Sequence, residues 1–283
     1  MSTSEISDVA NIVFIGGTWS AKEGKLMELQ VSAMSDRQRK FRATYRQQIA
    51  TWYNGWLHVA VIFISGFSVI YVCASNLRDV AWWMWGAVPV VFLAYQFGEY
   101  WAHRVWLHRP MRNGALRELY NRHTLQHHQF FTDHEMRFAD HLDWRVTFFP
   151  PFTMATMLLL ALPSAVICGL LISPNVGWLV MASVIGSYMW YELVHFCCHV
   201  ADNWFLVNCP IINTARRHHK AHHDHSIMME VNMGIGTPIF DWLYGTSDLD
   251  RGFFGHIFNG NSWKYVKSSL RKTAKTPSLT LQS

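Results

Sequence analysis

Charged residues are scarce in this sequence. Only 15% of its 283 residues are Asp, Glu, Lys or Arg, and 51% are hydrophobic. A soluble domain of this size has about 25% charged residues. The shortage argues against an ordinary soluble protein and indicates a membrane protein. The 14 tryptophans agree with this, because indole rings favour the headgroup level of a bilayer.

The sequence also lacks the features of several other protein classes. No charged start followed by an apolar core and a cleavage site occurs in the first forty residues, so we expect insertion through an internal segment. Five cysteines, mostly in or beside apolar runs, do not form an extracellular disulfide framework and are expected to be reduced. The basic residues that give the net charge of +5 form no stripe with aromatic partners, so nucleic acid is not an expected partner.

Four apolar stretches are long enough to cross a bilayer, which requires about 20 residues. Short turns separate the first stretch from the second and the third from the fourth. The pattern predicts an all-α integral membrane protein with four transmembrane helices arranged as two hairpins. The stretches are residues 52–73, 80–100, 148–172 and 176–198.

Positive charge lies on one side of these predicted helices. If both short turns face one side, Arg78 is the one cation there, and the other 23 Lys and Arg lie in three polar segments opposite. The positive-inside rule then predicts cytoplasmic termini and a cytoplasmic helical cap, in either a bacterial inner membrane or the endoplasmic reticulum.

The chain divides into three parts on this basis. Residues 1–50 form a cytoplasmic segment, in which "SDRQRKFRATYRQQ" predicts a basic amphipathic helix anchored to anionic headgroups. Residues 51–250 form the membrane domain. Residues 251–283 are a tail that we expect to be partly disordered.

Ten histidines occur in four clusters at the cytoplasmic ends of the second and fourth predicted spans and in the segments that follow. Residues three or four apart share a face of an α-helix, so most members of a cluster can point together. His103 and His108 are five apart, about 140° on a regular helix, and therefore need a helix end or different metals. The ten are His103, His108, His123, His127, His128, His195, His199, His219, His222 and His223, with His218 as an alternative to His219.

Taken singly, each histidine has an ordinary explanation as a capped or solvent-facing residue, and this is our interpretation of His58, His134, His141 and His256. The set of ten is different. A structural zinc takes four ligands, so ten imidazoles at one membrane face fit two metals with positions left open. Imidazole suits iron, copper, nickel and zinc alike, and so does not select the metal.

Two carboxylates accompany the clusters inside the predicted spans. Glu99 precedes His103 by four residues, and Glu192 precedes His195 by three. Each can accept a hydrogen bond from the second ring nitrogen of the nearby histidine and fix its tautomer. The alternative is a buried glutamate that is neutral or paired with an arginine. In either case an ionisable residue in a span indicates a functional site.

The spacing H-x4-H, H-x3-H-H, H-x3-H and H-x2-H-H on two membrane hairpins resembles the fatty acid hydroxylase and sterol desaturase superfamily of integral-membrane di-iron oxygenases. The segment "NMGIGTPIFDWLYGT", residues 232–246, is similar to the closing segment of that family. The resemblance implies that the ten histidines bind two non-haem irons and that Asn232 and Asp241 support them.

The same resemblance implies hydroxylation of an unactivated C–H bond of a lipid with O2, where the lipid is a fatty acyl chain, sphingoid base, sterol or aminolipid. Desaturation of a lipid is the alternative outcome. Some relatives carry a fused b-type cytochrome domain, which this sequence lacks together with any Gly-rich nucleotide fingerprint. We therefore expect a separate electron donor, a reductase with a cytochrome or ferredoxin.

A membrane metal transporter or other non-catalytic metal-binding protein is the second functional hypothesis. Transporters place ionisable ligands near the bilayer midplane, often at broken helices. The middles of the four spans are almost purely apolar here, which favours the enzyme.

Overall fold

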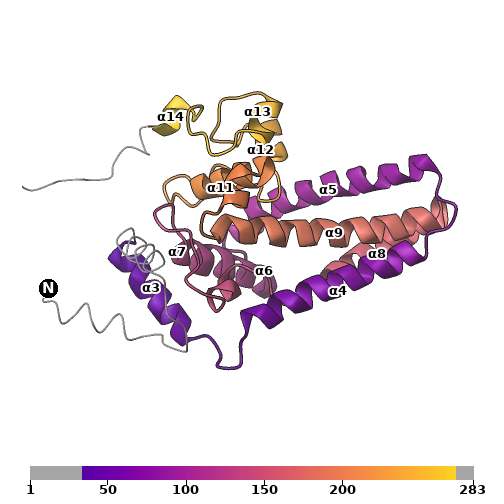
Figure 1. The fold of residues 1–283 in the computed structure, drawn as a ribbon, viewed down its shortest axis with the longest axis horizontal. Helices are drawn as coiled ribbons and strands as arrows, with labels where there is room; N and C mark the ends of the chain where they lie inside the picture. The colour runs from indigo at the N-terminus through magenta and orange to yellow at the C-terminus, as the bar shows by residue number, and fades with distance from the viewer. Residues whose placement is uncertain (1–33, 272–283) are drawn as a thin grey trace, which may run out of the picture.

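The computed structural model describes residues 34–271, and this part of the chain contains helices and no strands apart from two isolated bridges. Four long helices run side by side, and a group of short helices and loops covers one of their ends (Figure 1). The prediction of an all-α protein is confirmed for these residues.

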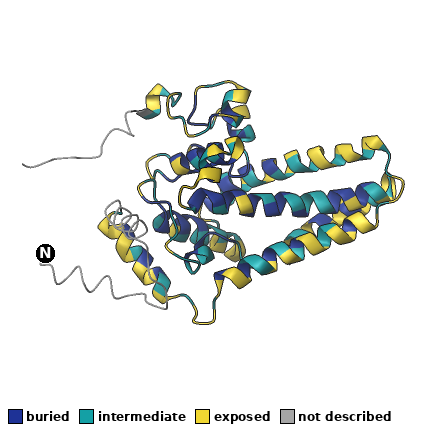
Figure 2. Ribbon diagram, in the orientation of Figure 1, coloured by how far each residue is buried: buried dark blue, intermediate teal, exposed yellow. Residues whose placement is uncertain are grey.

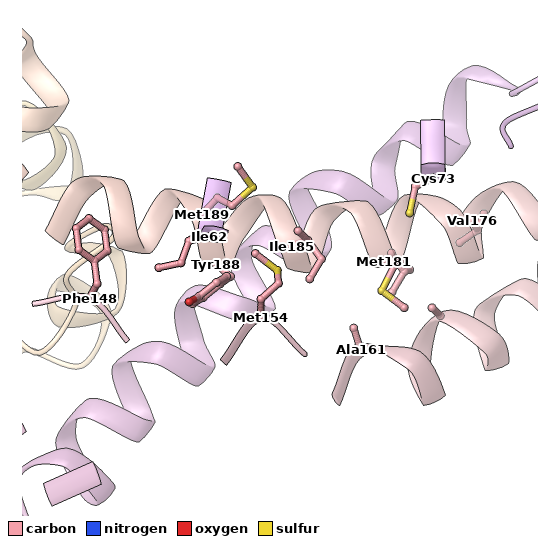
Figure 3. Packing of buried hydrophobic residues seen from close by; sticks show 12 residues of the cluster. Ile62, Cys73, Phe148, Met154, Ala161, Val176, Met181, Ile185, Tyr188 and Met189 are labelled. Atoms are coloured by element: carbon pink, nitrogen blue, oxygen red, sulfur yellow. The ribbon is translucent and has the colours of Figure 1, made fainter. Parts of the chain in front are cut away.

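One long helix overlaps each predicted apolar stretch: α4 (Gly55–Ser75), α5 (Ala87–Ala102), α8 (Thr153–Leu171) and α9 (Pro174–His199). The helix α9 packs against the other three and is the most buried of the four (Figure 2). Ile62 of α4 lies with the α9 residues Ile185, Tyr188 and Met189 in one core cluster between the helices (Figure 3).

In the structure α4 is followed by α5 and α8 by α9 through short connections, and small residues allow close approach of the helices. A Cβ added to Gly177 of α9 would lie 2.6 Å from the carbonyl oxygen of Ala165 in α8, so these backbones are nearly in contact. The connection between α4 and α5 also contacts the start of α9. The Asn175 side chain accepts a hydrogen bond from the amide of Arg78 at 3.0 Å and donates to the Arg78 carbonyl at 2.5 Å.

Two of the long helices, α4 and α8, are long and apolar enough to cross a membrane by length and composition. The helix α5 has 16 residues and follows a short helix, η1 (Trp82–Gly86), and α9 has 26 residues. Neither meets the same criterion within residues 34–271. The arrangement of four membrane-spanning helices in two hairpins therefore stays a prediction.

The cap is built from short elements. Two of them are π-helical turns: η2 (His103–Leu107), which continues α5, and η3 (Asn121–His127), which continues α6 (Gly114–Tyr120). The other elements are α7 (His128–Phe130), η4 (Asp143–Val146), α10 (Trp204–Asn208), α11 (Pro210–His222), α12 (Ile239–Leu243), α13 (Phe253–Ile257) and α14 (Ser268–Arg271).

The basic segment near the N-terminus forms α3 (Asp36–Gln47), as predicted, but two of its arginines bind protein groups. The Arg42 guanidinium donates to the carbonyl oxygens of Phe130 and Glu135, and burial lowers its pKa to about 10. Arg46 forms a two-pronged ion pair with Asp143 at 2.7 and 2.8 Å. These two arginines attach α3 to the cap. Anchoring of the segment to anionic headgroups stays a prediction.

The ends of the chain lie outside the described residues. Residues 1–33 belong to the predicted N-terminal segment, and residues 272–283 to the tail for which partial disorder was expected. Within the described part of the tail, Ser268–Arg271 forms the short helix α14.

Candidate metal centre

The ten clustered histidines are all buried, in the cap and at the end of α9 that it covers, and form two adjacent groups. Nine of them make up sets in which the candidate ligand nitrogens all lie within 4.8 Å of one another. The first group is His103, His108, His123, His128 and His222, and the second is His127, His195, His199 and His219. The tenth, His223, joins them: its ring stacks on His128 with centroids 4.2 Å apart, and its Nε2 atom lies 3.0 Å from that of His219.

The π-helical turns explain how the first group is assembled. Hydrogen bonds from i to i+5 widen the helix, so residues five apart lie nearly above one another. His103 and His108 flank the turn η2 in this way, and their Nε2 atoms are 3.1 Å apart. His123 and His128 stand in the same relation across η3, also at 3.1 Å. The expected helix end is present, because α5 ends at Ala102 and the π-helical turn begins at His103. Both histidines fall in the same group, so the alternative of different metals does not apply.

Regular α-helical spacing supplies much of the second group. His195 and His199 are four residues apart near the end of α9 and share a face. On α11, His219 faces the second group, with its Nε2 atom 3.1 Å from that of His199. His222, three residues on, faces the first group, 2.9 Å from His108. The helix α11 therefore lies between the two groups and contributes to both.

Backbone carbonyls fix the tautomer of five of the histidines. A carbonyl oxygen only accepts hydrogen bonds, so a ring nitrogen that contacts one must carry the proton. The Nε2 atom of each of these rings is then free to bind a metal. The pairs are His103 with Met233 (2.5 Å), His127 with Val146 (3.1 Å), His199 with Met136 (2.8 Å), His222 with Val231 (2.9 Å) and His223 with Phe131 (2.8 Å).

The contact between His127 and His223 tests whether a cation fits. Both rings donate through Nδ1, so the lone pairs of their Nε2 atoms face each other at 3.1 Å. Protonation does not relieve this contact, because burial lowers the pKa of His127 to about 3. A metal ion does: nitrogens about 2.1 Å from an ion and at right angles lie roughly 3 Å apart. The residues fit a metal centre on this ground.

The segment after α11 supports the first group. Asp241 is fully buried, and its Oδ1 and Oδ2 atoms accept the backbone amides of Met233 and Gly234 at 2.8 and 2.6 Å. This carboxylate thereby fixes the loop whose Met233 carbonyl orients His103. Asn232 adopts a left-handed backbone, φ 60°, and its side chain donates to the His218 carbonyl. Both residues thus contact segments that carry candidate ligands, and the supporting role that the resemblance implies for them stays a prediction.

The expected contacts of the two glutamates are wrong. Glu99 accepts the backbone amides of Ile235 and Gly236 at 2.6 and 2.9 Å, and has no bond to His103. Glu192 accepts the Tyr188 hydroxyl at 2.8 Å. Neither glutamate pairs with an arginine in the described chain. Glu99 supports the centre through the loop that carries Met233.

The structure separates His218 from His219. His219 belongs to the second group, whereas His218 turns away and its Nε2 atom lies 3.1 Å from the Asp241 carboxylate. This hydrogen bond helps to keep the pKa of Asp241 low against the opposing effect of burial. His218 therefore contacts the carboxylate that fixes the Met233 loop.

The remaining histidines lie outside both groups. His58 contacts the Tyr53 hydroxyl and the Phe149 carbonyl, His256 contacts the Gly252 carbonyl, and His134 is exposed. His141 accepts the amide of Gly55. His225 contacts the carbonyl of His128 at 2.7 Å, so it supports the cluster.

The chain is similar to a solved structure and to a protein family. The solved structure of full-length Scs7p, in which only the hydroxylase domain is visible, resembles this one with a TM-score of 0.47 and 17% sequence identity. The match covers 69% of this chain and 66% of that one, a little under two thirds of its length. No protein with a curated function matches the chain.

A family model gives the stronger result. The model described as fatty acid hydroxylase matches residues 88–246, which is more than half of the chain and includes all ten clustered histidines. The chain therefore belongs to the fatty acid hydroxylase family.

Proposed function

We propose that this protein is a membrane-bound hydroxylase that binds two irons and inserts one atom of O2 into an unactivated C–H bond of a lipid. The observation that carries the proposal is the pair of adjacent, buried, all-imidazole groups in a chain of the fatty acid hydroxylase family. The overall reaction consumes a C–H bond, O2, two electrons and two protons, and yields an alcohol and water.

Each group of histidines would bind one iron, with His223 between them. Two irons bound there would supply the oxidising power for C–H cleavage, which protein side chains lack. The histidines present unprotonated Nε2 atoms, and the carbonyls behind them fix the ring orientations. Burial of all ten rings excludes water, which protects a reactive centre from side reactions.

A lipid substrate is supported by an apolar groove between α4, α5 and α9. It has a volume of about 450 Å³ and is lined by residues such as Ile70, Val88, Phe92 and Leu179. Ser187 lines the groove on α9, eight residues before His195, which corresponds to roughly 12 Å along the helix. The apolar tail of a lipid in this groove would extend toward the histidines, where the reacting carbon has to lie.

We further propose that all four long helices cross the bilayer and that the cap and both termini are cytoplasmic. Leu159, Leu170, Ile64 and Val90 project from three of these helices with more than 60% of their surface exposed. Exposure of so many large apolar side chains is unfavourable in water but suits contact with lipid. The distribution of Lys and Arg sets the orientation.

Hydroxylation is favoured over desaturation by the description of the matching family. Both outcomes start with removal of one hydrogen, and positioning of the substrate decides between oxygen transfer and removal of a second hydrogen. A metal transporter is disfavoured, because the ten histidines lie together in the cap beyond the apolar parts of the long helices.

The test is a comparison of lipids from cells that express the unmodified chain, His123→Ala or His141→Ala. His123 belongs to the first group, and His141 is a partly exposed histidine outside both groups, so it serves as the matched control. We expect a lipid species that gains one oxygen with the unmodified chain and the control, and its absence with His123→Ala. Loss of two hydrogens would indicate desaturation. Identical lipids from all three would contradict the proposal.

A further inference from the structure

A polar cavity of about 280 Å³ opens on the surface of the cap, beside the second histidine group. Its walls come from the C-terminal end of α9, from α11, from residues 134–137 and from residues 261–263. It is distinct from the apolar groove, which lies among α4, α5 and α9.

The floor of this cavity is directly connected to two histidines of the second group. Met136 lines the cavity, and its carbonyl oxygen accepts the Nδ1 hydrogen bond of His199 at 2.8 Å. Lys220 also lines it and follows His219 in the chain. A molecule bound in the cavity would therefore lie beside residues that adjoin the second group: Met136, which is hydrogen-bonded to His199, and Lys220, which follows His219.

Cations outnumber acids around the cavity. Its lining contains Arg137, Arg216, Arg217, Lys220, Glu135 and Asp202. Each arginine has an ion-pair partner, as in Arg216 with Asp202 at 2.5 Å. The exposed Lys220 has no salt-bridge partner within the described residues, so its charge is available to a molecule that binds there.

An aromatic side chain stands at the same place. Trp263 is 48% exposed, and its indole ring stacks on the buried Arg217 guanidinium with 4.5 Å between the Cζ atom and the ring centroid. Arg217 is itself fixed by Asp248 at 2.7 Å. A rigid, half-exposed tryptophan beside arginines is typical of the residues that contribute most to protein–protein binding.

We propose that the cavity, with Lys220 and Trp263 at its rim, is the docking site of the electron donor, and that the donor is a one-electron carrier protein with an acidic face. The inference rests on the proposed function, which requires two electrons per turnover. The ten histidines are buried, so electrons must come from a carrier bound close to them. The lipid approaches from the apolar groove, which leaves the polar side of the cap to the donor.

A lipid headgroup with a negative charge fits the cavity less well. Glu135 and Asp202 lie among the cations and would repel a small anion, whereas a protein surface can match charges of both signs. The two occupants differ in their consequences: loss of a docking contact slows electron delivery from a protein, and loss of a headgroup contact slows turnover with any reductant.

The experiment uses the full-length protein in lipid nanodiscs, loaded with iron and oxidised. Reduced plant-type [2Fe–2S] ferredoxin, an acidic carrier, is mixed with it, and its reoxidation is followed by stopped-flow absorbance. Lys220→Glu is compared with Arg112→Glu, which reverses an exposed charge between η2 and α6, away from the cavity. Dithionite serves as the small reductant in parallel.

At low salt we expect Lys220→Glu to lower the second-order rate constant on the order of tenfold, because a rim charge acts mainly on association. The difference should shrink at about 0.5 M salt, where charges are screened within a few ångströms. Trp263→Ala should lower the rate constant at every salt concentration. Arg112→Glu should stay within about twofold of the unmodified protein, and dithionite should reduce all four proteins at the same rate.

Two results would overturn the docking site. One is an equal effect of Lys220→Glu and Arg112→Glu, which would mean a general effect of charge. The other is a loss of dithionite-driven lipid oxidation in Lys220→Glu as large as the loss with ferredoxin, which would assign the cavity to substrate binding. Failure of the proposed function is a separate outcome, because the unmodified protein would then bind no iron that dithionite can reduce.

Discussion

The Nε2 atoms of His127 and His223 lie 3.1 Å apart, although both rings donate their Nδ1 hydrogens to backbone carbonyls. Two lone pairs that face each other in a buried site repel, and neither ring readily accepts a proton there. The contact becomes favourable when both Nε2 atoms bind a cation. A metal ion bound by these nitrogens would remove the repulsion, so metal binding should stabilise the fold.

Removal of metal should therefore destabilise the protein. A ligand that binds the folded state at a thousandfold excess over its Kd adds about 4 kcal/mol of stability. We expect the thermal midpoint of the purified protein in detergent to fall after chelation and to recover on addition of ferrous iron. In His127→Ala, the thermal midpoints of the chelated and the iron-loaded protein should differ by less than in the unmodified protein, because the variant lacks one metal contact.

The stability of the metal-free protein should fall with acid. Burial lowers the pKa of His222 to about 4 and that of His127 to about 3, against an ordinary value of 6.5. The unfolded chain therefore binds more protons than the folded one below pH 6.5. Stability is fully present above that pH and is lost as the pH falls toward 4, by about 1.4 kcal/mol per pH unit for each such histidine.

Thermal unfolding of the chelated protein between pH 7.5 and 4.5 measures this effect. A thermal midpoint that does not change over this range would contradict the account, because it would mean that the buried histidines take up protons without cost.

Asp241→Asn should weaken iron binding. The substitution keeps the size of the side chain but removes the charge that accepts two backbone amides and the His218 ring. Loss of a supporting group of this kind typically costs 10–100-fold in metal affinity. Competition with a colorimetric chelator measures the affinity. Asp202→Asn is the control, since the Asp202 side chain is 77% exposed, and it should retain the unmodified affinity.

Asp248→Asn should destabilise the cap by about 3–5 kcal/mol, the range found when one partner of a buried ion pair is removed. Asp248 and Arg217 are almost fully buried and pair through two hydrogen bonds, one of them at 2.7 Å. Denaturant unfolding of the metal-free protein measures the change, with Asp202→Asn again as the control. A loss of less than about 1 kcal/mol, as for an exposed pair, would show that Arg217 finds another partner.

The ten histidines that the structure brings together could be recognised from the sequence. Histidines three or four apart on α9 and α11 follow the regular helical period, and that period can be recognised in a sequence. The pairing of His103 with His108 was not predictable in the same way. It depends on the π-helical turn η2, and a single H-x4-H gives no sign of one. The recurrence of that spacing at His123 and His128 was the available signal.

The groups that orient the histidines could not be predicted from the sequence, for a different reason. Five rings are fixed by backbone carbonyls, such as those of Met233 and Phe131, and every residue has a carbonyl, so no side-chain pattern marks them. Glu99 was identified as a supporting residue, but its actual partners are the amides of Ile235 and Gly236. Those residues are more than 130 positions away in the sequence, and local spacing does not connect them.

Metal analysis of the purified protein tests the central claim most directly. Protein produced in iron-replete cells and purified without chelators is assayed for iron, zinc, copper and nickel, with protein concentration from amino-acid analysis. The account predicts two irons per chain, falling by at least one in both His123→Ala and His199→Ala, which belong to different histidine groups. A single metal per chain, or full occupancy by zinc with no iron, would contradict the account.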